Sequence, residues 1–238
     1  MKGPHMIQRH ARLLARDNIF TRDDAIDIEF TYDSGDPQLA ELDAKWGLRG
    51  IAGAGDTQAR ALKLLHWLCA HTRHGNPQSL PEGLRMDAAS LLDWSFDRPG
   101  NDPNGKHLSV MLSECLLAVG VKAYVLWCFP KVPDGQKACV VQAWLPEEAR
   151  WIMLDPSFGT YFTDKAGRIL CAREVREHLA SGALRDSSLA RNMYYFNRAR
   201  DTKAGMLDAD CALVHLCPSG FDLSEGSPVY ATYESFWE

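Results

Sequence analysis

The stretch from Gly105 to Val119 constrains the fold more than any other part of the chain. Its apolar side chains recur at helical spacing, Asn104 is a good N-cap in front of it, and Gly120 is a helix stop behind it. The apolar positions are Leu108, Met111, Leu112, Cys115, Leu116 and Val119. The pattern predicts a helix over 104–119 that packs this apolar stripe against a core.

Three segments with the composition of strands follow this helix. Residues 121–129, 138–145 and 150–154 are rich in β-branched and aromatic side chains. A Pro/Gly segment and an acidic turn separate them, which is typical of an antiparallel meander. Upstream, residues 57–72 carry another apolar stripe at helical spacing. We therefore predict an α+β fold in which a buried central helix packs on an antiparallel sheet.

The length and composition suit one globular domain. The chain has 238 residues, of which 46% are hydrophobic and 24% charged, and no repeat or long linker divides it. We interpret its parts as a cloning-tag scar at residues 1–6, an N-terminal arm at 7–38, a single domain at 39–200, and an irregular C-terminal extension at 201–238 packed on the same domain.

Composition also argues against several classes of partner and cofactor. The net charge is -5 and the Lys and Arg residues are scattered, so we expect no nucleic-acid partner. No apolar run approaches the roughly 20 residues that span a bilayer, so we expect no membrane partner. Seven cysteines without a CxxC pair indicate reduced thiols and a cytoplasmic protein. His71 and His74 lack a third ligand at metal spacing, and no nucleotide-binding motif occurs, so we expect neither a metal nor a cofactor.

Several segments resemble the transglutaminase-like superfamily, whose core is related to that of papain. The helix that ends at Gly120 and runs into an apolar strand is similar to the family's central helix. The segment Trp151–Ser157, which contains Asp155-Pro156, is similar to its Asp-bearing strand. Residues 139–144 resemble its His-bearing strand, and residues 64–75 match a helix of bacterial members. The resemblance implies a single transglutaminase-like domain.

The resemblance also implies a catalytic site, and this chain departs from it. The family transfers acyl groups with a Cys at the start of the central helix, a His on the next strand and an Asp on the strand after. Counted back from Gly120, the nucleophile position falls on Gly105, the base position on Cys139 and the orienting position on Asp155. Only Asp155 matches the family, so the ordinary cysteine mechanism is not available.

Three interpretations of this departure stay open. In the first, the site is retired and binds a ligand, with Gly105, Gln142 and Trp144 lining it. In the second, Cys139 is a relocated nucleophile, and His107 is the nearest candidate base. Against His107, residues two apart on a helix point roughly 200° from each other. In the third, Asp155 is a carboxylate base for non-covalent chemistry.

Each of these side chains also has a purely structural interpretation. Cys139 suits core packing, Trp144 suits core packing too, and Asp155 before a proline suits a turn. If the resemblance holds, Gly105, Cys139 and Asp155 converge at one end of the central helix. Cys139 and Asp155 on opposite faces of the sheet would contradict the alignment.

The function expected from the sequence is that of a binding protein. A degenerate triad predicts a protein of a specialised pathway that binds a small molecule, or an acyl or aminoacyl group, free or attached to a carrier. It would lack ordinary transglutaminase or protease activity. The alternative is an atypical acyl-transfer or amide-forming enzyme that uses Cys139 or Asp155, and the sequence leaves open whether the protein is an enzyme.

Overall fold

The structure is a computed structural model of the chain. It describes residues 35–77, 80–97, 99–129 and 138–181, together with residues 12, 14, 21, 22 and 183 and the short strands 195–199 and 213–217. Its helices are α2 (Pro37–Trp46), α3 (Leu48–Ala52), α4 (Thr57–His71), α5 (Ala88–Asp97), α6 (Gly105–Ala118) and α7 (Ala172–Ala180). Its strands are β1 (Thr21–Arg22), β2 (Ala123–Phe129), β3 (Ala138–Leu145), β4 (Arg150–Leu154), β5 (Tyr195–Ala199) and β6 (Leu213–Cys217).

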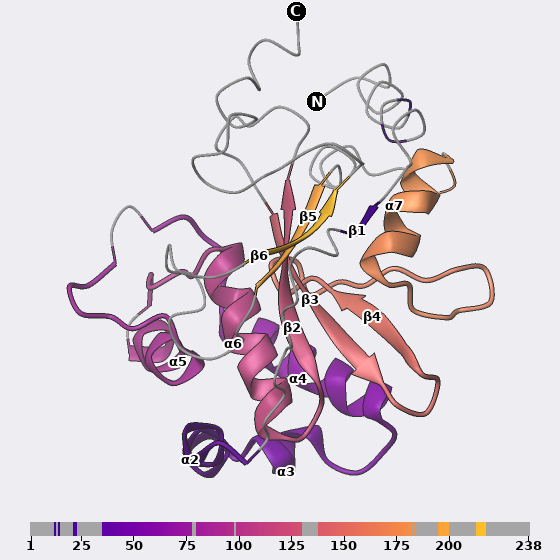
Figure 1. The fold of residues 1–238 in the computed structure, drawn as a ribbon. Coiled ribbons are helices and arrows are strands. Elements are labelled where there is room, and N and C mark those ends of the chain that lie inside the picture. Colours follow the sequence, from indigo (N-terminus) through magenta and orange to yellow (C-terminus); the bar gives the residue numbers. More distant parts are fainter. Residues whose placement is uncertain are drawn as a thin grey trace, which may run out of the picture.

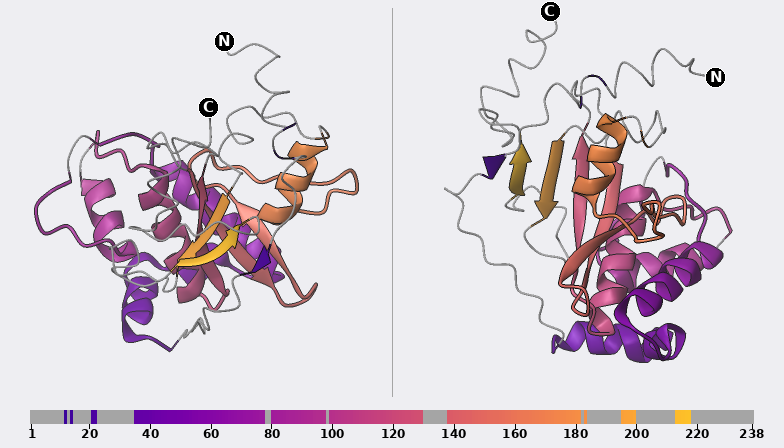
Figure 2. Two further views of the ribbon diagram at one scale, coloured as in Figure 1. Left: turned by 45° about the horizontal axis from the view of Figure 1, so that its top comes forward. Right: turned by 90° about the vertical axis from the view of Figure 1, so that its right-hand side faces the viewer.

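The strands form one antiparallel sheet of six strands in the order β1-β6-β5-β2-β3-β4. The right-hand view of Figure 2 shows β1, β6, β5 and β2 side by side. The meander β2-β3-β4 that the sequence predicts is confirmed, and the bounds of β3 and β4 match the prediction. The α+β class is therefore correct.

Helix α6 is the central element of the core. It lies between α5 and the sheet (Figure 1) and also packs against α2 and α4. The predicted apolar stripe is buried, with Leu108, Met111 and Leu112 almost inaccessible to solvent. Asn104 caps the helix as predicted, because its side chain accepts a hydrogen bond from the His107 amide at 3.1 Å. The core beneath α6 thus follows directly from the sequence pattern.

Two short strands lie toward the C-terminal end of the chain. Residues 213–217, predicted to be part of an irregular extension, form β6, and residues 195–199 form β5, which the sequence did not indicate. Each strand is only five residues long and pairs with residues distant in sequence, so no local signal marks it. Residues 1–6, most of residues 7–34 of the predicted arm 7–38, and most of 201–238 lie outside the described residues.

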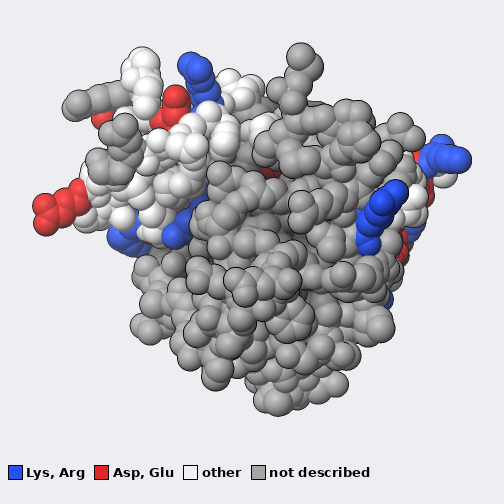
Figure 3. All heavy atoms as spheres, turned by 90° about the horizontal axis from the view of Figure 1, so that it is seen from above, with Lys and Arg blue, Asp and Glu red and all other residues white. Residues whose placement is uncertain are grey.

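Two further features of the described residues concern partners. No helix among them is long and apolar enough to cross a bilayer. On the face drawn in Figure 3, the Lys and Arg side chains that the structure describes lie near Asp and Glu side chains at the margins. These charges of opposite sign are interspersed.

Candidate functional site

Three segments distant in sequence meet at the N-terminal end of α6. The Gly75 amide, beyond the end of α4, donates a hydrogen bond of 2.9 Å to the carbonyl of Pro103, just before α6. The Cys69 thiol, on α4, donates to the carbonyl of Pro156, just after β4, at 3.4 Å. We call this meeting place the junction, and it consists of residues 69–75, 102–105 and 155–159.

Gly75 allows the first two segments to come this close. A Cβ atom at position 75 would lie 2.4 Å from the Cβ atom of Asp102 and 3.2 Å from its carbonyl oxygen. Any side chain larger than hydrogen would push the segments apart. His74 precedes this glycine, so the contact between Gly75 and Asp102 fixes where His74 enters the junction.

Gly105, the predicted nucleophile position, lies at the centre of the junction. A Cβ atom at position 105 would lie 2.7 Å from Ser157 Oγ and 4.0 Å from His74 Nε2. The space that a side chain at position 105 would occupy is therefore taken by the Ser157 hydroxyl. Ser157 is half-buried and His74 is exposed, so solutes can reach this point.

Asp155, the predicted orienting residue, holds the third segment in place. Its side chain is buried, with 8% exposed, and Oδ1 accepts a hydrogen bond of 2.9 Å from the Ser157 amide. The backbones of Asp155 and Thr160 exchange hydrogen bonds of 2.8 and 3.0 Å, which closes the loop between them. The carboxylate thus fixes the position of Ser157 next to Gly105.

Cys69 is the cysteine of the junction, and it is a weak nucleophile. Burial, with the negative charge of Asp155 as a smaller cause, raises the pKa of the Cys69 thiol to about 11. At neutral pH the group is therefore a thiol, and it donates to Pro156. Gly159 has a φ of 64°, and a Cβ atom at its position would lie 3.3 Å from the Cys69 sulfur. Cys69 acts here as a packing residue.

Cys139, the predicted base position, lies on the core face of β3. In the β3–β4 register Val141 lies across from Leu154, and both belong to the hydrophobic core together with Cys139, which is 4% exposed. Helix α6 packs against this face of the sheet. The charges of Cys139 and Asp155 are both smaller causes, after burial, of the raised pKa of the Cys128 thiol.

The expected convergence of Gly105, Cys139 and Asp155 stays a prediction as far as Cys139 is concerned. The structure brings Gly105 and the Asp155 loop together and places Cys139 on the core face of β3. The base that the family uses is missing, because residues 138–145 contain no histidine.

His107, the candidate base for the relocated mechanism, belongs to the helix cap. Its Nδ1 accepts a hydrogen bond of 3.3 Å from the Asn104 amide, which completes a capping box, and its ring lies edge-on to Trp94 of α5. Only 3% of the residue is exposed. Burial, with the positive charge of Lys106 as a smaller cause, lowers its pKa to about 4. His107 therefore contacts α5, whereas Gly105, two residues earlier on α6, approaches Ser157 in the loop after β4.

Gln142 and Trp144, the predicted ligand-binding residues of β3, make contacts within the protein. Gln142 is buried, and its Oε1 accepts a hydrogen bond of 3.3 Å from the Ala172 amide at the start of α7. Trp144 packs edge-on against Trp151 across the β3–β4 pair, with ring centroids 5.3 Å apart. Both side chains anchor secondary structure.

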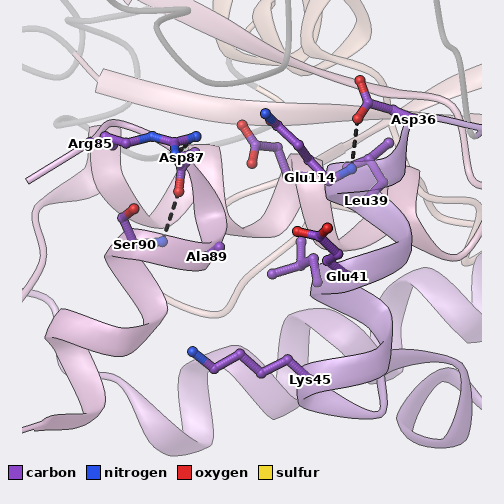
Figure 4. A pocket seen from close by; sticks show the side chains of 11 residues that line it. Asp36, Leu39, Glu41, Lys45, Arg85, Asp87, Ala89, Ser90 and Glu114 are labelled. Carbon is purple, nitrogen blue, oxygen red and sulfur yellow. Dashed lines mark hydrogen bonds and ion pairs between the residues drawn. The ribbon is translucent and has the colours of Figure 1, made fainter.

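A separate pocket of about 290 Å³ lies between α2, the start of α5 and α6. Figure 4 shows that its lining carries both signs of charge, including Lys45, Arg85, Asp87 and Glu114. Arg85 and Asp87 form an ion pair, and Glu114 accepts a hydrogen bond from the Ala88 amide. Glu114 is nine residues after Gly105, or about 13 Å along the helix axis. The pocket is therefore distinct from the junction.

The described residues contain no group of three or more His, Cys, Asp or Glu side chains that could hold a metal ion. The chemistry that the junction offers is that of a hydroxyl, an imidazole and a carboxylate at a helix N-terminus. Two of these groups, Ser157 and His74, were not among the site residues predicted from the sequence. Their sequence signals are weak: His74 precedes a glycine after α4, and Ser157 follows Asp155-Pro156.

Comparisons with known proteins leave the family open. No protein-family model matches the sequence, and no curated protein matches it. One similar solved structure is described as a "putative protease" from Parabacteroides distasonis ATCC 8503. It has 16% sequence identity and a TM-score of 0.36, and the match covers 49% of this chain and 25% of that chain. This chain matches about a quarter of that protein, and membership of the transglutaminase-like superfamily stays a prediction.

Proposed function

We propose that this protein is a transglutaminase-like domain that binds an acyl or amide group at the junction and lacks the ordinary cysteine mechanism. The observation that carries the proposal is the position of Gly105. The helix N-terminus, where a thiolate would be stabilised, carries no side chain, and a hydroxyl from another segment fills that space. The amide groups of the first helical turn favour a ligand with a carbonyl oxygen there.

The relocated-cysteine alternative has less support. Cys139 is buried on the core face of β3, where an acyl donor would have to displace core side chains to reach its sulfur. The alternative with Asp155 as base has more support, since the Asp155 carboxylate lies at the junction. However, one oxygen of that carboxylate already accepts the Ser157 amide. Both stay as outcomes that an experiment can distinguish.

A binding experiment with an acetyl thioester tests the proposal. S-acetyl-N-acetylcysteamine carries a small acyl group on a carrier-like arm, and amide chemical shifts of the full chain report where it binds. We expect saturable shifts at Gly75, Gly105 and Ser157. The variant Gly105→Leu fills the junction and abolishes these shifts, whereas Gly50→Leu is a matched control, since nothing lies within 4 Å of a Cβ at Gly50.

The contrary outcomes are specific. Shifts confined to the pocket between α2, α5 and α6 would place the ligand elsewhere and refute the proposal. A thioester trapped on Cys139 and lost in Cys139→Ala would establish the relocated mechanism. No saturable shift with this thioester at any concentration up to its solubility would also count against a site for acyl groups.

A further inference from the structure

We infer that the junction contains a nucleophile and a base of its own: Ser157 attacks an activated acyl group, and His74 accepts its proton. This inference rests on the proposed binding of an acyl group at the junction. It differs from the sequence-based alternatives because it uses neither Cys139, His107 nor Asp155 as the reacting group.

The first support is the position of the two side chains. Ser157 Oγ and His74 Nε2 lie 2.7 and 4.0 Å from the same point, the place of a Cβ atom on Gly105. The side chain of a nucleophile at the start of α6 would begin at this point. Ser157 therefore brings its hydroxyl to the helix N-terminus from the loop after β4, and His74 brings an imidazole from the segment after α4.

The second support is that hydrogen bonds hold the backbone near both residues, while the reactive side-chain atoms make no hydrogen bond within the described part of the chain. The Ser157 amide is held by Asp155, and the segment of His74 is held by the bond from Gly75 to Pro103. Within the described part of the chain, no hydrogen bond engages Ser157 Oγ or the His74 ring, which contacts the Phe158 ring at 5.8 Å between centroids. The two distances to the Cβ position on Gly105, 2.7 and 4.0 Å, limit the separation of the hydroxyl and the imidazole nitrogen to less than 7 Å.

The third support comes from the other histidines that the structure describes. His71 Nδ1 is bonded to the Trp67 carbonyl, and its ring stacks on Phe96. The ring of His178 is bonded to a carbonyl on α7, and that of His107 belongs to the cap of α6. His66 is exposed in the middle of α4, before its C-terminal end. Among the histidines whose side chains the structure describes, His74 is the one near position 105 and Ser157.

The reaction that this pair supports is acyl transfer to serine from an ester or thioester. The Ser157 oxygen forms a bond to the carbonyl carbon, the carbonyl oxygen becomes negative, and the Ser157 proton passes to His74 Nε2. The bond from carbon to the leaving oxygen or sulfur then breaks, and the proton passes from His74 to the leaving group. The products are an acyl-serine ester and an alcohol or thiol. The N-terminal end of α6 favours the negative oxygen of the intermediate.

Acylation by p-nitrophenyl acetate tests the inference on the full chain. Attack releases p-nitrophenol, read by absorbance, and adds one acetyl group to the protein, located by peptide mass mapping. We expect one acetyl group on Ser157, no acetylation there in Ser157→Ala, and a rate lower by a factor of about 10² or more in His74→Asn. The matched controls Ser181→Ala and His66→Asn replace exposed residues away from the junction and keep the wild-type rate.

A second variant keeps the test decisive if Ser157→Ala fails to fold. Ser157→Cys replaces the hydroxyl by a thiol, whose reaction with iodoacetamide at pH 7 we expect to be faster than that of any native cysteine. Adding His74→Asn should slow this reaction by a factor of about 10 or more, since the imidazole no longer favours the thiolate. A new thiol that reacts at the same rate with and without His74 overturns the inference.

The outcomes separate this inference from the proposed function. Thioester-induced shifts at Gly105 and Ser157 without acetylation of Ser157 would refute the nucleophile and leave the binding site. Acetyl groups found only on lysines or on Cys139 would refute it as well. Absence of both shifts and acetylation would refute the inference and the proposed function together.

Discussion

Replacing Gly75 by alanine tests how the junction is held together. The new Cβ atom would lie 2.4 Å from the Cβ atom of Asp102 and 3.2 Å from its carbonyl oxygen. Carbon atoms in proteins approach to about 3.5 Å at best, so the two segments must separate by about an ångström. Separation weakens the bond from the Gly75 amide to the Pro103 carbonyl, now 2.9 Å long.

The expected cost follows from these two effects. Overpacking of this kind costs about 1–3 kcal/mol, and loss of one backbone hydrogen bond costs about 1 kcal/mol. We therefore expect Gly75→Ala to lower the free energy of unfolding by about 2–4 kcal/mol. Truncation of the neighbour, in Asp102→Gly, removes the atom that clashes. The double variant should recover at least about 1 kcal/mol relative to the sum of the single changes.

Urea unfolding followed by circular dichroism measures these differences. The matched control is Gly50→Ala, which adds the same methyl group within α3 where nothing lies within 4 Å. We expect it to raise stability by about 0.5–1 kcal/mol, because alanine favours a helix over glycine. Equal stability of Gly75→Ala and the wild type, at an unchanged slope on urea, would show that the close approach of residues 75 and 102 is not a constraint.

Three further changes test other parts of the structure. Gly105→Ala places a methyl group 2.7 Å from Ser157 Oγ. We expect the free energy of unfolding to change by less than about 1 kcal/mol, since the serine side chain can rotate. We also expect loss of Ser157 acetylation, and retained acetylation would contradict the role of this contact. Because the folded-state pKa of His107 is about 4, against an ordinary histidine pKa of 6.5, the unfolded chain takes up the proton first as pH falls. The stability due to neutral His107 is full above about pH 6.5 and is lost toward pH 4, by up to about 3 kcal/mol; urea midpoints across this range should show a steeper loss for the wild type than for His107→Gln. Leu112→Asp buries an unpaired charge in the core and should abolish cooperative unfolding seen by near-ultraviolet circular dichroism.

The core could be predicted from the sequence because its signals are local. The apolar positions of α6 repeat at the helical period, and the flanking Asn104 and Gly120 mark its ends. Strands β3 and β4 are bounded by turn residues and were predicted with correct limits. Strands β5 and β6 were not predicted, because each is only five residues long and pairs on one side with a strand remote in sequence, β2 or β1.

The junction could be predicted only in part. The place of Gly105 follows from counting along one helix, which is a local measurement. How close Cys139 comes to Asp155 depends on how the paired strands β3 and β4 end, and the sequence pattern of either strand does not give that. His74 and Ser157 meet only because Gly75 lets two loops approach, and the sequence carries no signal for a contact between loops.

The bond between Gly75 and Pro103 has a consequence for how the protein fluctuates. It joins two loops outside the helices and the sheet. Its amide can therefore exchange with deuterium through a local opening that leaves the core intact. A molecule in this open state keeps its circular dichroism spectrum while His74 is displaced. A few contacts between loops set the fraction of molecules in which the junction is closed. The protection of the Gly75 amide against hydrogen exchange measures that fraction.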